Sequence, residues 1–153
     1  MRQIFFCFLL SMFFTSCKKP PLDYRDVYTG EFLFTTLHNV IAKCYDEPDC
    51  IDGWRIMYID TLQFESDVLK EGTERMKICL YPTYQELGIL GQTIFPIIHN
   101  DGLLSDPIGF PEWWKILDFK GCFIEKDTIS ISFRHLIGMG GYDKYEITGV
   151  RVQ

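Results

Sequence analysis

The chain of 153 residues contains a single alanine, Ala42. Residues that favour extended backbone are abundant instead, with 17 isoleucines, 13 phenylalanines and 8 tyrosines. Alanine is the strongest helix former, whereas β-branched and aromatic side chains fit the pleated surface of a sheet. Glycines and prolines interrupt the apolar segments at short intervals, as they do where strands are joined by turns. The sequence therefore predicts an all-β domain.

Alternation of apolar and polar residues predicts about eight strands. The pattern is clearest after Lys126 and Asp127, where Ile129, Ile131 and Phe133 alternate with small or polar residues. Asp-Gly at positions 101 and 102 supplies the positive φ angles of a tight hairpin turn. The expected strand segments are residues 28–37, 54–64, 67–70, 75–81, 93–99, 103–104 with the residues that follow, 118–125, 128–135 and 142–152.

Short connections between consecutive strands predict an antiparallel meander. Closure into a barrel removes unpaired strand edges, and eight strands enclose room for side chains or one small ligand. We therefore expect a lipocalin-like barrel or a closely related sandwich. In the second segment, strict alternation predicts one face with Trp54, Ile56 and Tyr58 and an opposite face with Arg55, Met57 and Ile59.

The first 16 residues have the parts of a secretory signal peptide. Arg2 supplies the positive start, and an apolar run from Ile4 to Phe14 follows. Eleven helical residues span roughly 16 Å, about half of the hydrocarbon core of a bilayer, so this run is too short to cross a membrane. We interpret residues 1–16 as a signal peptide that is cleaved on export.

Phe14-Thr15-Ser16-Cys17 resembles a bacterial lipobox, in which the cysteine thiol takes a diacylglycerol. Each buried methylene contributes about 0.8 kcal/mol, so two or three acyl chains give a lasting anchor. The alternative is an ordinary signal peptide beside an unmodified cysteine. We expect residues 17–26, which are charged and Pro-rich, to be a lipidated N-terminus and tether, and residues 27–153 to be a single domain. The predicted location is the cell envelope, at the outer membrane.

Charge excludes one class of partner. Removal of residues 1–16 takes away one basic residue, so 14 basic residues stand against 21 acidic ones, a net charge of −7. A protein that binds nucleic acid needs a cationic surface. We therefore expect the membrane, reached through the N-terminal lipid, and a small apolar ligand or an envelope protein as partners, and no nucleic acid.

Disulfides persist in the oxidising compartment to which the leader directs the chain. Cys44 and Cys50 flank an acidic loop, and two adjacent antiparallel strands would bring them together. A bridge that closes this loop contributes about 2.4 kcal/mol in the chain-entropy treatment. A second bridge between Cys79 and Cys122 is the weaker candidate, because buried cysteines are often unbridged.

Several turn motifs occur in an order that resembles the small β-rich lipoproteins of gut-type Gram-negative bacteria. The resemblance implies a shortened lipocalin-like barrel, and it carries no catalytic residue. The matching segments are Tyr-Thr-Gly-Glu-Phe at 28–32, Asn-Asp-Gly-Leu at 100–103, Gly-Cys-Phe-Ile-Glu-Lys-Asp-Thr-Ile at 121–129, Gly-Met-Gly-Gly-Tyr at 138–142 and Tyr-Glu-Ile-Thr-Gly-Val-Arg at 145–151.

Three histidines, His38, His99 and His135, lie near the ends of expected strands. No serine, cysteine or carboxylate accompanies them at a recognised catalytic spacing. We interpret them as surface residues and expect no enzyme activity, with a hydrolase that uses His135 as a third alternative. The acidic residues between Cys44 and Cys50 miss the calcium-loop spacing, so we expect neither a metal nor a cofactor.

Phe110, Trp113 and Trp114 lie beside Gly109 and Pro111 in an irregular segment. Aromatic residues on loops bind sugar rings, lipids or partner proteins, so these three form a candidate binding loop. The alternative, which we favour, is that they plug one end of the barrel.

Two candidate functions agree best with these observations. The first is a non-enzymatic binding module at the cell envelope for a small apolar ligand or a partner protein. The second is a structural or accessory lipoprotein that docks to an envelope complex and has no ligand pocket. An interior cavity of a few hundred cubic ångströms favours the first. A barrel filled with side chains and an exposed apolar patch favour the second.

A Cys17→Ala substitution tests the anchor. The variant should lose labelling by fatty acid and move from the membrane fraction to the soluble fraction, because no thiol is left to take the diacylglycerol. Continued acylation of the variant would show that Cys17 is not the site.

Overall fold

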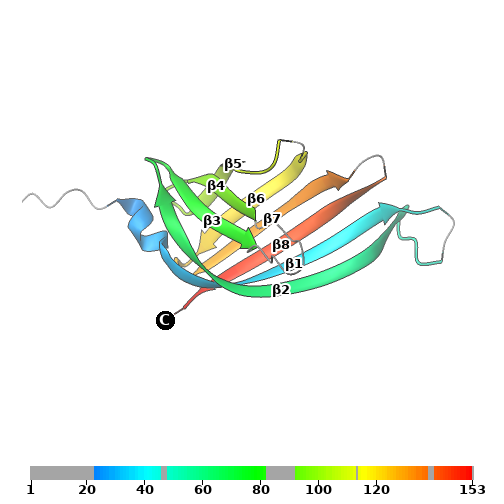
Figure 1. Ribbon diagram of the computed structural model, residues 1–153, viewed down its shortest axis with the longest axis horizontal. Helices are drawn as coiled ribbons and strands as arrows, with labels where there is room; N and C mark the ends of the chain where they lie inside the picture. Colours follow the sequence, from blue (N-terminus) through cyan, green and yellow to red (C-terminus); the bar gives the residue numbers. More distant parts are fainter. Residues whose placement is uncertain (1–22, 46–47, 82–91, 113, 138–139, 153) are drawn as a thin grey trace, which may run out of the picture.

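The computed structural model describes residues 23–45, 48–81, 92–112, 114–137 and 140–152. These residues form one short 3-10 helix and eight strands (Figure 1). The elements are Tyr24–Tyr28 (η1), Gly30–Lys43 (β1), Trp54–Glu71 (β2), Arg75–Tyr81 (β3), Gln92–Ile98 (β4), Leu103–Ile108 (β5), Ile116–Ile124 (β6), Thr128–Ile137 (β7) and Gly141–Arg151 (β8).

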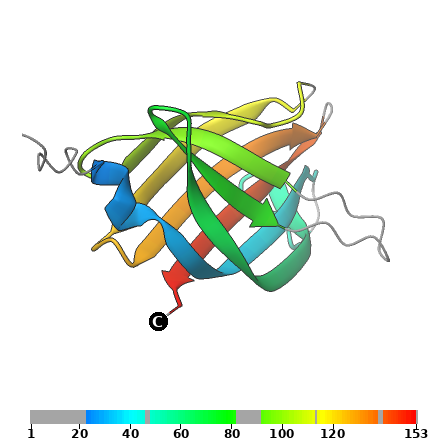
Figure 2. The same cartoon turned by 60° about the vertical axis from the view of Figure 1, so that its left-hand side comes forward.

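Each strand runs antiparallel to the next, and β8 returns to pair with β1. The closing ladder extends from Phe32 opposite Arg151 to Ala42 opposite Gly141, and Figure 2 shows the two strands side by side. The strand order is that of a closed eight-stranded meander. The predicted all-β, lipocalin-like barrel is therefore confirmed, and the sandwich alternative is not formed.

The interior of the barrel is packed with apolar side chains. Successive residues of a strand point to opposite faces, and alternate residues of β1, β3, β4, β7 and β8 are buried. Aromatic rings meet across the core: Phe34 stacks on Phe64 at 5.4 Å between centroids, and Tyr28 lies 4.7 Å from Phe123. The largest side chains with almost no exposed surface are Phe32, Phe34, Phe133, Met76, Ile78, Leu80, Ile94, Ile98, Ile129, Ile131, Ile147 and Val68.

β2 is one strand of 18 residues, where two shorter segments were predicted. The expected break at Glu65 and Ser66 does not occur, because these residues pair with Leu33 and Phe32 of β1. Glu65 is exposed on the outer face, where a charged side chain interrupts nothing. Glu65 in the sequence therefore marked the exposed face and not the end of a strand.

The pairing of β1 with β2 contains a bulge. Ile41 lies opposite Ile56 and Val40 lies opposite Tyr58, so Met57 is an extra residue on β2. The strict alternation predicted for this segment is wrong from Met57 onward. Trp54 and Ile56 share the outer face of the barrel wall, whereas Tyr58 is shifted to the inner face, because a bulge changes the alternation by one residue.

η1 starts the folded domain earlier than predicted, since Asp23 already caps it and the tether was expected to reach Asp26. Arg25 donates hydrogen bonds to the Asp23 carboxylate, at 2.7 Å, and to the Gly72 carbonyl, at 2.9 Å. The hydrogen bonds from Arg25 hold the pKa of Asp23 well below its ordinary value. These contacts fasten the start of the domain to the turn between β2 and β3.

A methyl group added at Gly149 tests the packing of the core. An alanine Cβ there would lie 2.6 Å from both Ile129 Cγ2 and Phe34 Cε1. Overpacking of this kind costs about 1–3 kcal/mol, so Gly149→Ala should lower the urea midpoint of unfolding. Gly140→Ala is the matched control, because no atom lies within 4 Å of its Cβ position. Equal stability of the two variants would contradict the packing described.

Candidate functional site

The hairpin of β1 and β2 extends beyond the neighbouring strand β3, at the end of the barrel opposite η1 (Figure 1). We call this part the arm: residues 40–43 of β1, residues 54–60 of β2 and the described residues between them, 44–45 and 48–53. Within the loop, Ile51 and Trp54 exchange two backbone hydrogen bonds of 2.8 and 2.9 Å. These two bonds hold the backbone of the loop against the start of β2.

A disulfide closes the tip of the arm. Cys44 and Cys50 are bonded, with 5.9 Å between their Cα atoms, which confirms the predicted bridge. The Cys44 amide also donates to the Gly53 carbonyl, at 3.1 Å, across the base of the loop. A cross-link over a loop this short removes conformational freedom from the arm.

The arm carries a row of exposed apolar side chains. Ile56, Met57, Tyr58 and Ile59 are 52–58% exposed, although they are consecutive residues of one strand. Because their side chains point to both faces, neither face of the strand is covered here. Large contiguous apolar surface that is exposed in a monomer marks an interaction site. The alternation in the sequence could have located the strand. It could not have shown that β2 extends beyond β3.

A groove of about 410 Å³ lies beside the tip of the arm, where it is lined by Asp49 and Ile51 of the loop and by Trp54 and Ile56 of β2. The ring of Trp54 contacts that of Tyr142 edge to face, at 5.3 Å between centroids. Lys43 lies over the Trp54 ring and Arg134 over the Tyr142 ring. The groove continues the apolar surface of the arm, and charged side chains of both signs, Lys43, Arg134 and Asp49, lie around it.

Inside the barrel, near the arm, one carboxylate lies between two imidazoles. Asp143 Oδ2 is 3.4 Å from His135 Nδ1, and Asp143 Oδ1 is 3.1 Å from His38 Nε2. The contact with His38 lacks hydrogen-bond alignment and is electrostatic when the imidazole is protonated. His38 stacks on Tyr145 at 4.5 Å, and Trp114 stacks on His135 at 4.4 Å. The prediction of surface histidines is therefore wrong for His135, which is buried, whereas the ring of His38 is partly buried.

His99 is the histidine that does lie on the surface. Its Nε2 is 2.7 Å from Ser105 Oγ, at the end of the barrel where the Tyr28 hydroxyl donates to the Asn100 carbonyl. The three histidines therefore do not meet at one place. Among the described residues, no group of three His, Cys, Asp or Glu side chains is arranged to hold a metal ion.

The structure describes two of the three residues of the predicted binding loop, Phe110 and Trp114. Phe110 and Trp114 pack against the core, and Phe110 meets the Phe133 ring at 5.1 Å. Trp113 lies outside the described residues. For Phe110 and Trp114 the arrangement is that of a barrel plug, formed where the Trp114 amide donates to the Pro111 carbonyl, at 2.8 Å.

The weaker disulfide candidate is not formed: Cys79 and Cys122 are not bonded to each other. Cys79 is on β3 between the buried residues Ile78 and Leu80, and Cys122 on β6 precedes the buried Phe123. Both thiols therefore point outward from strands that are not neighbours in the barrel. Cys17 and the predicted signal peptide lie outside the described residues, so lipidation stays a prediction.

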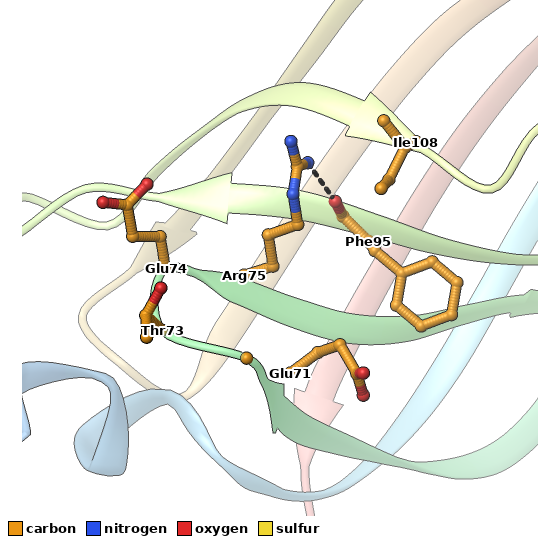
Figure 3. A pocket seen from close by; sticks show the side chains of 7 residues that line it. Glu71, Thr73, Glu74, Arg75, Phe95 and Ile108 are labelled. Carbon is orange, nitrogen blue, oxygen red and sulfur yellow. Dashed lines mark hydrogen bonds between the residues drawn. The ribbon is translucent and has the colours of Figure 1, made fainter.

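A second hollow, of about 510 Å³, lies on the outer surface near η1 (Figure 3). Arg75 crosses it and donates to the Phe95 carbonyl, at 2.6 Å, and to the Asp106 carboxylate, at 2.8 Å. Glu71 and Glu74 line its rim. Because Arg75 is engaged by the protein itself, the hollow offers an open, acidic surface and not an enclosed ligand site.

Comparison of the chain with models of protein families, with curated proteins and with solved structures finds no significant match. In the described part of the chain, no helix is long and apolar enough to cross a membrane.

Replacement of Asp143 tests whether the interior cluster is structural. Asp143→Ala removes the carboxylate that His135 and His38 share, and a hydrogen bond to a charged group contributes about 1.5–3 kcal/mol. The urea midpoint should fall accordingly. Asp118→Ala removes an exposed ion pair with Arg134 and should cost less than about 1 kcal/mol. If the two variants were equally stable, the cluster would contribute nothing to the fold.

Proposed function

We propose that the protein is a lipid-anchored docking module of the cell envelope, held to the membrane through Cys17, which binds a partner protein with the arm. The observation that carries the proposal is the row of four consecutive apolar residues, 56–59, each more than half exposed. Water contact with so much apolar surface is unfavourable, at roughly 25 cal/mol per Å². A partner that covers the row removes this cost.

The packed interior supports docking over carriage of a small ligand. Side chains from β1, β3, β4, β7 and β8 fill the interior positions, and the two hollows described above open on the outer surface. An enclosed apolar cavity is what a ligand carrier needs. The Phe110 and Trp114 rings, which pack on the core near the arm, add to the filling.

The position of the arm supports the same function. η1, from which the chain continues toward Cys17, lies at one end of the barrel, and the arm lies at the other (Figure 1). An 18-residue strand is up to roughly 60 Å long, so β2 connects the two ends. With the anchor at one end, the apolar row at the other is accessible to envelope proteins.

Conversion of the row to polar residues tests this function. The full chain is extracted from membranes in mild detergent, and its assembly size is measured by native electrophoresis. Wild type should migrate above the monomer, and Ile56→Thr with Ile59→Thr should release the monomer, because threonine keeps the β-branched shape and removes apolar surface. Ile108→Thr with Ile124→Thr is the matched control, since these two side chains are similarly exposed away from the arm.

Two results would contradict docking through the arm. One is that wild type and both double variants all migrate as the monomer. The other is that an apolar molecule co-purifies in a one-to-one ratio and stays bound in the variant with Thr at positions 56 and 59.

A further inference from the structure

The arm has one strand edge without a described partner. β2 pairs with β1 along its length, from Val68 opposite Gly30 to Trp54 opposite Lys43. On its other side, pairing with β3 covers Leu69 to Glu71 alone. At the tip of the arm Ile51 pairs with Trp54 on this side. Among the described residues, the edge of β2 from Arg55 to Val68 therefore presents unpaired backbone groups. Such an edge is a template for another strand, above all where it is apolar.

The bulge at Met57 arranges the charges and the isoleucines of this edge. Arg55 and Asp60 lie opposite Ala42 and His38, which are four residues apart on β1 and so share a face. Ile56 and Ile59 lie opposite Ile41 and Asn39, which share the other face. Without the extra residue, positions five apart such as Arg55 and Asp60 would point to opposite faces.

The segment is consequently self-complementary. Its order is a cation, four apolar residues and an anion, Arg55-Ile-Met-Tyr-Ile-Asp60. In an antiparallel pair of two identical strands related by a two-fold axis, Arg55 of each faces Asp60 of the other on the inner face. Ile56 then faces Ile59 on the outer face. Pairing displaced by two residues brings neither charge opposite its counterpart.

We propose that the partner docked on the arm is a second copy of this chain, which adds residues 55–60 of its β2 edge to the same residues of the first in this register, since Ile51 occupies the position opposite Trp54. The inference rests on the proposed function and names its partner. The interface is isologous, as in a two-fold dimer, so every contact occurs twice. Opposite charges directly across two strands stabilise their pairing, and like charges there destabilise it.

The size of the row sets the strength of the dimer. Four large side chains, each about half exposed, supply roughly 800 Å² for two copies, less than the area of about 1,000 Å² that a specific interface usually exceeds. Pairing therefore depends on both copies being held in one membrane or one detergent micelle, where their effective concentration is high. Because the strands are antiparallel, the two η1 ends lie at opposite ends of the dimer, whose long axis then lies along the membrane.

The test is photo-cross-linking of the full chain in cells. A photo-reactive phenylalanine analogue replaces Tyr58, and the control places it at Ile124, which is equally exposed but remote from the arm. We expect a product of twice the mass of the chain from position 58 and not from position 124. Arg55→Asp or Asp60→Arg alone should reduce this product roughly tenfold or more. The two substitutions together should restore it, because they exchange the charges of both pairs.

The outcomes separate the two proposals. A product of double mass that does not respond to the charge substitutions, or is not restored by the double variant, overturns the proposed pairing. Cross-linking of position 58 to a different protein overturns the second copy as partner and leaves the docking function standing. If position 58 gave no more product than position 124, both the docking function and the second copy as partner would be overturned. Thermal unfolding of each variant, expected to match wild type, verifies that the substitutions leave the barrel intact.

Discussion

The ladder between β8 and β1 joins the last strand to the first and turns an open meander into a barrel. Closure gives most strands a neighbour on both sides and places the aromatic and aliphatic core on the inside. The strands differ in length, however: β1 has 14 residues and β2 has 18, whereas β3 has 7. The edge of β2 that outruns β3 is thus a consequence of closure with unequal strands, and the arm follows from it.

Local patterns predicted the strands well where strand and turn signals agreed. Residues 75–81 were predicted as a strand and form β3 with the same limits. The Cys44–Cys50 bridge was also predictable, because the hairpin and the bridge need the same two strands to be adjacent. Glu65 and Ser66 were misinterpreted as a break, because the sequence does not show that β1 provides partners for β2 from Trp54 to Val68.

The candidate site depended on contacts that no local pattern contains. His135 is buried and His38 is partly buried because Asp143, Tyr145 and Trp114 contact them from elsewhere in the chain. The bulge at Met57 is equally invisible, since the residues 54–59 are compatible with plain alternation. Its effect is large, because one added residue moves Tyr58 to the inner face and brings Ile56 and Ile59 to the same side. The apolar and charged residue types of the arm could be read from the sequence, but the faces on which they lie could not.

The central claim is that the described residues of the chain leave the β2 edge from Arg55 to Val68 open. Amide hydrogen exchange of the folded chain in dilute solution, followed residue by residue, measures this most directly. The account predicts slow exchange from Phe32 to Ala42 of β1, which has neighbours on both sides, and fast exchange of alternate amides of β2 that point away from β1. Uniformly slow exchange along this part of β2 at low protein concentration would contradict it, because another part of the same chain would then cover the edge.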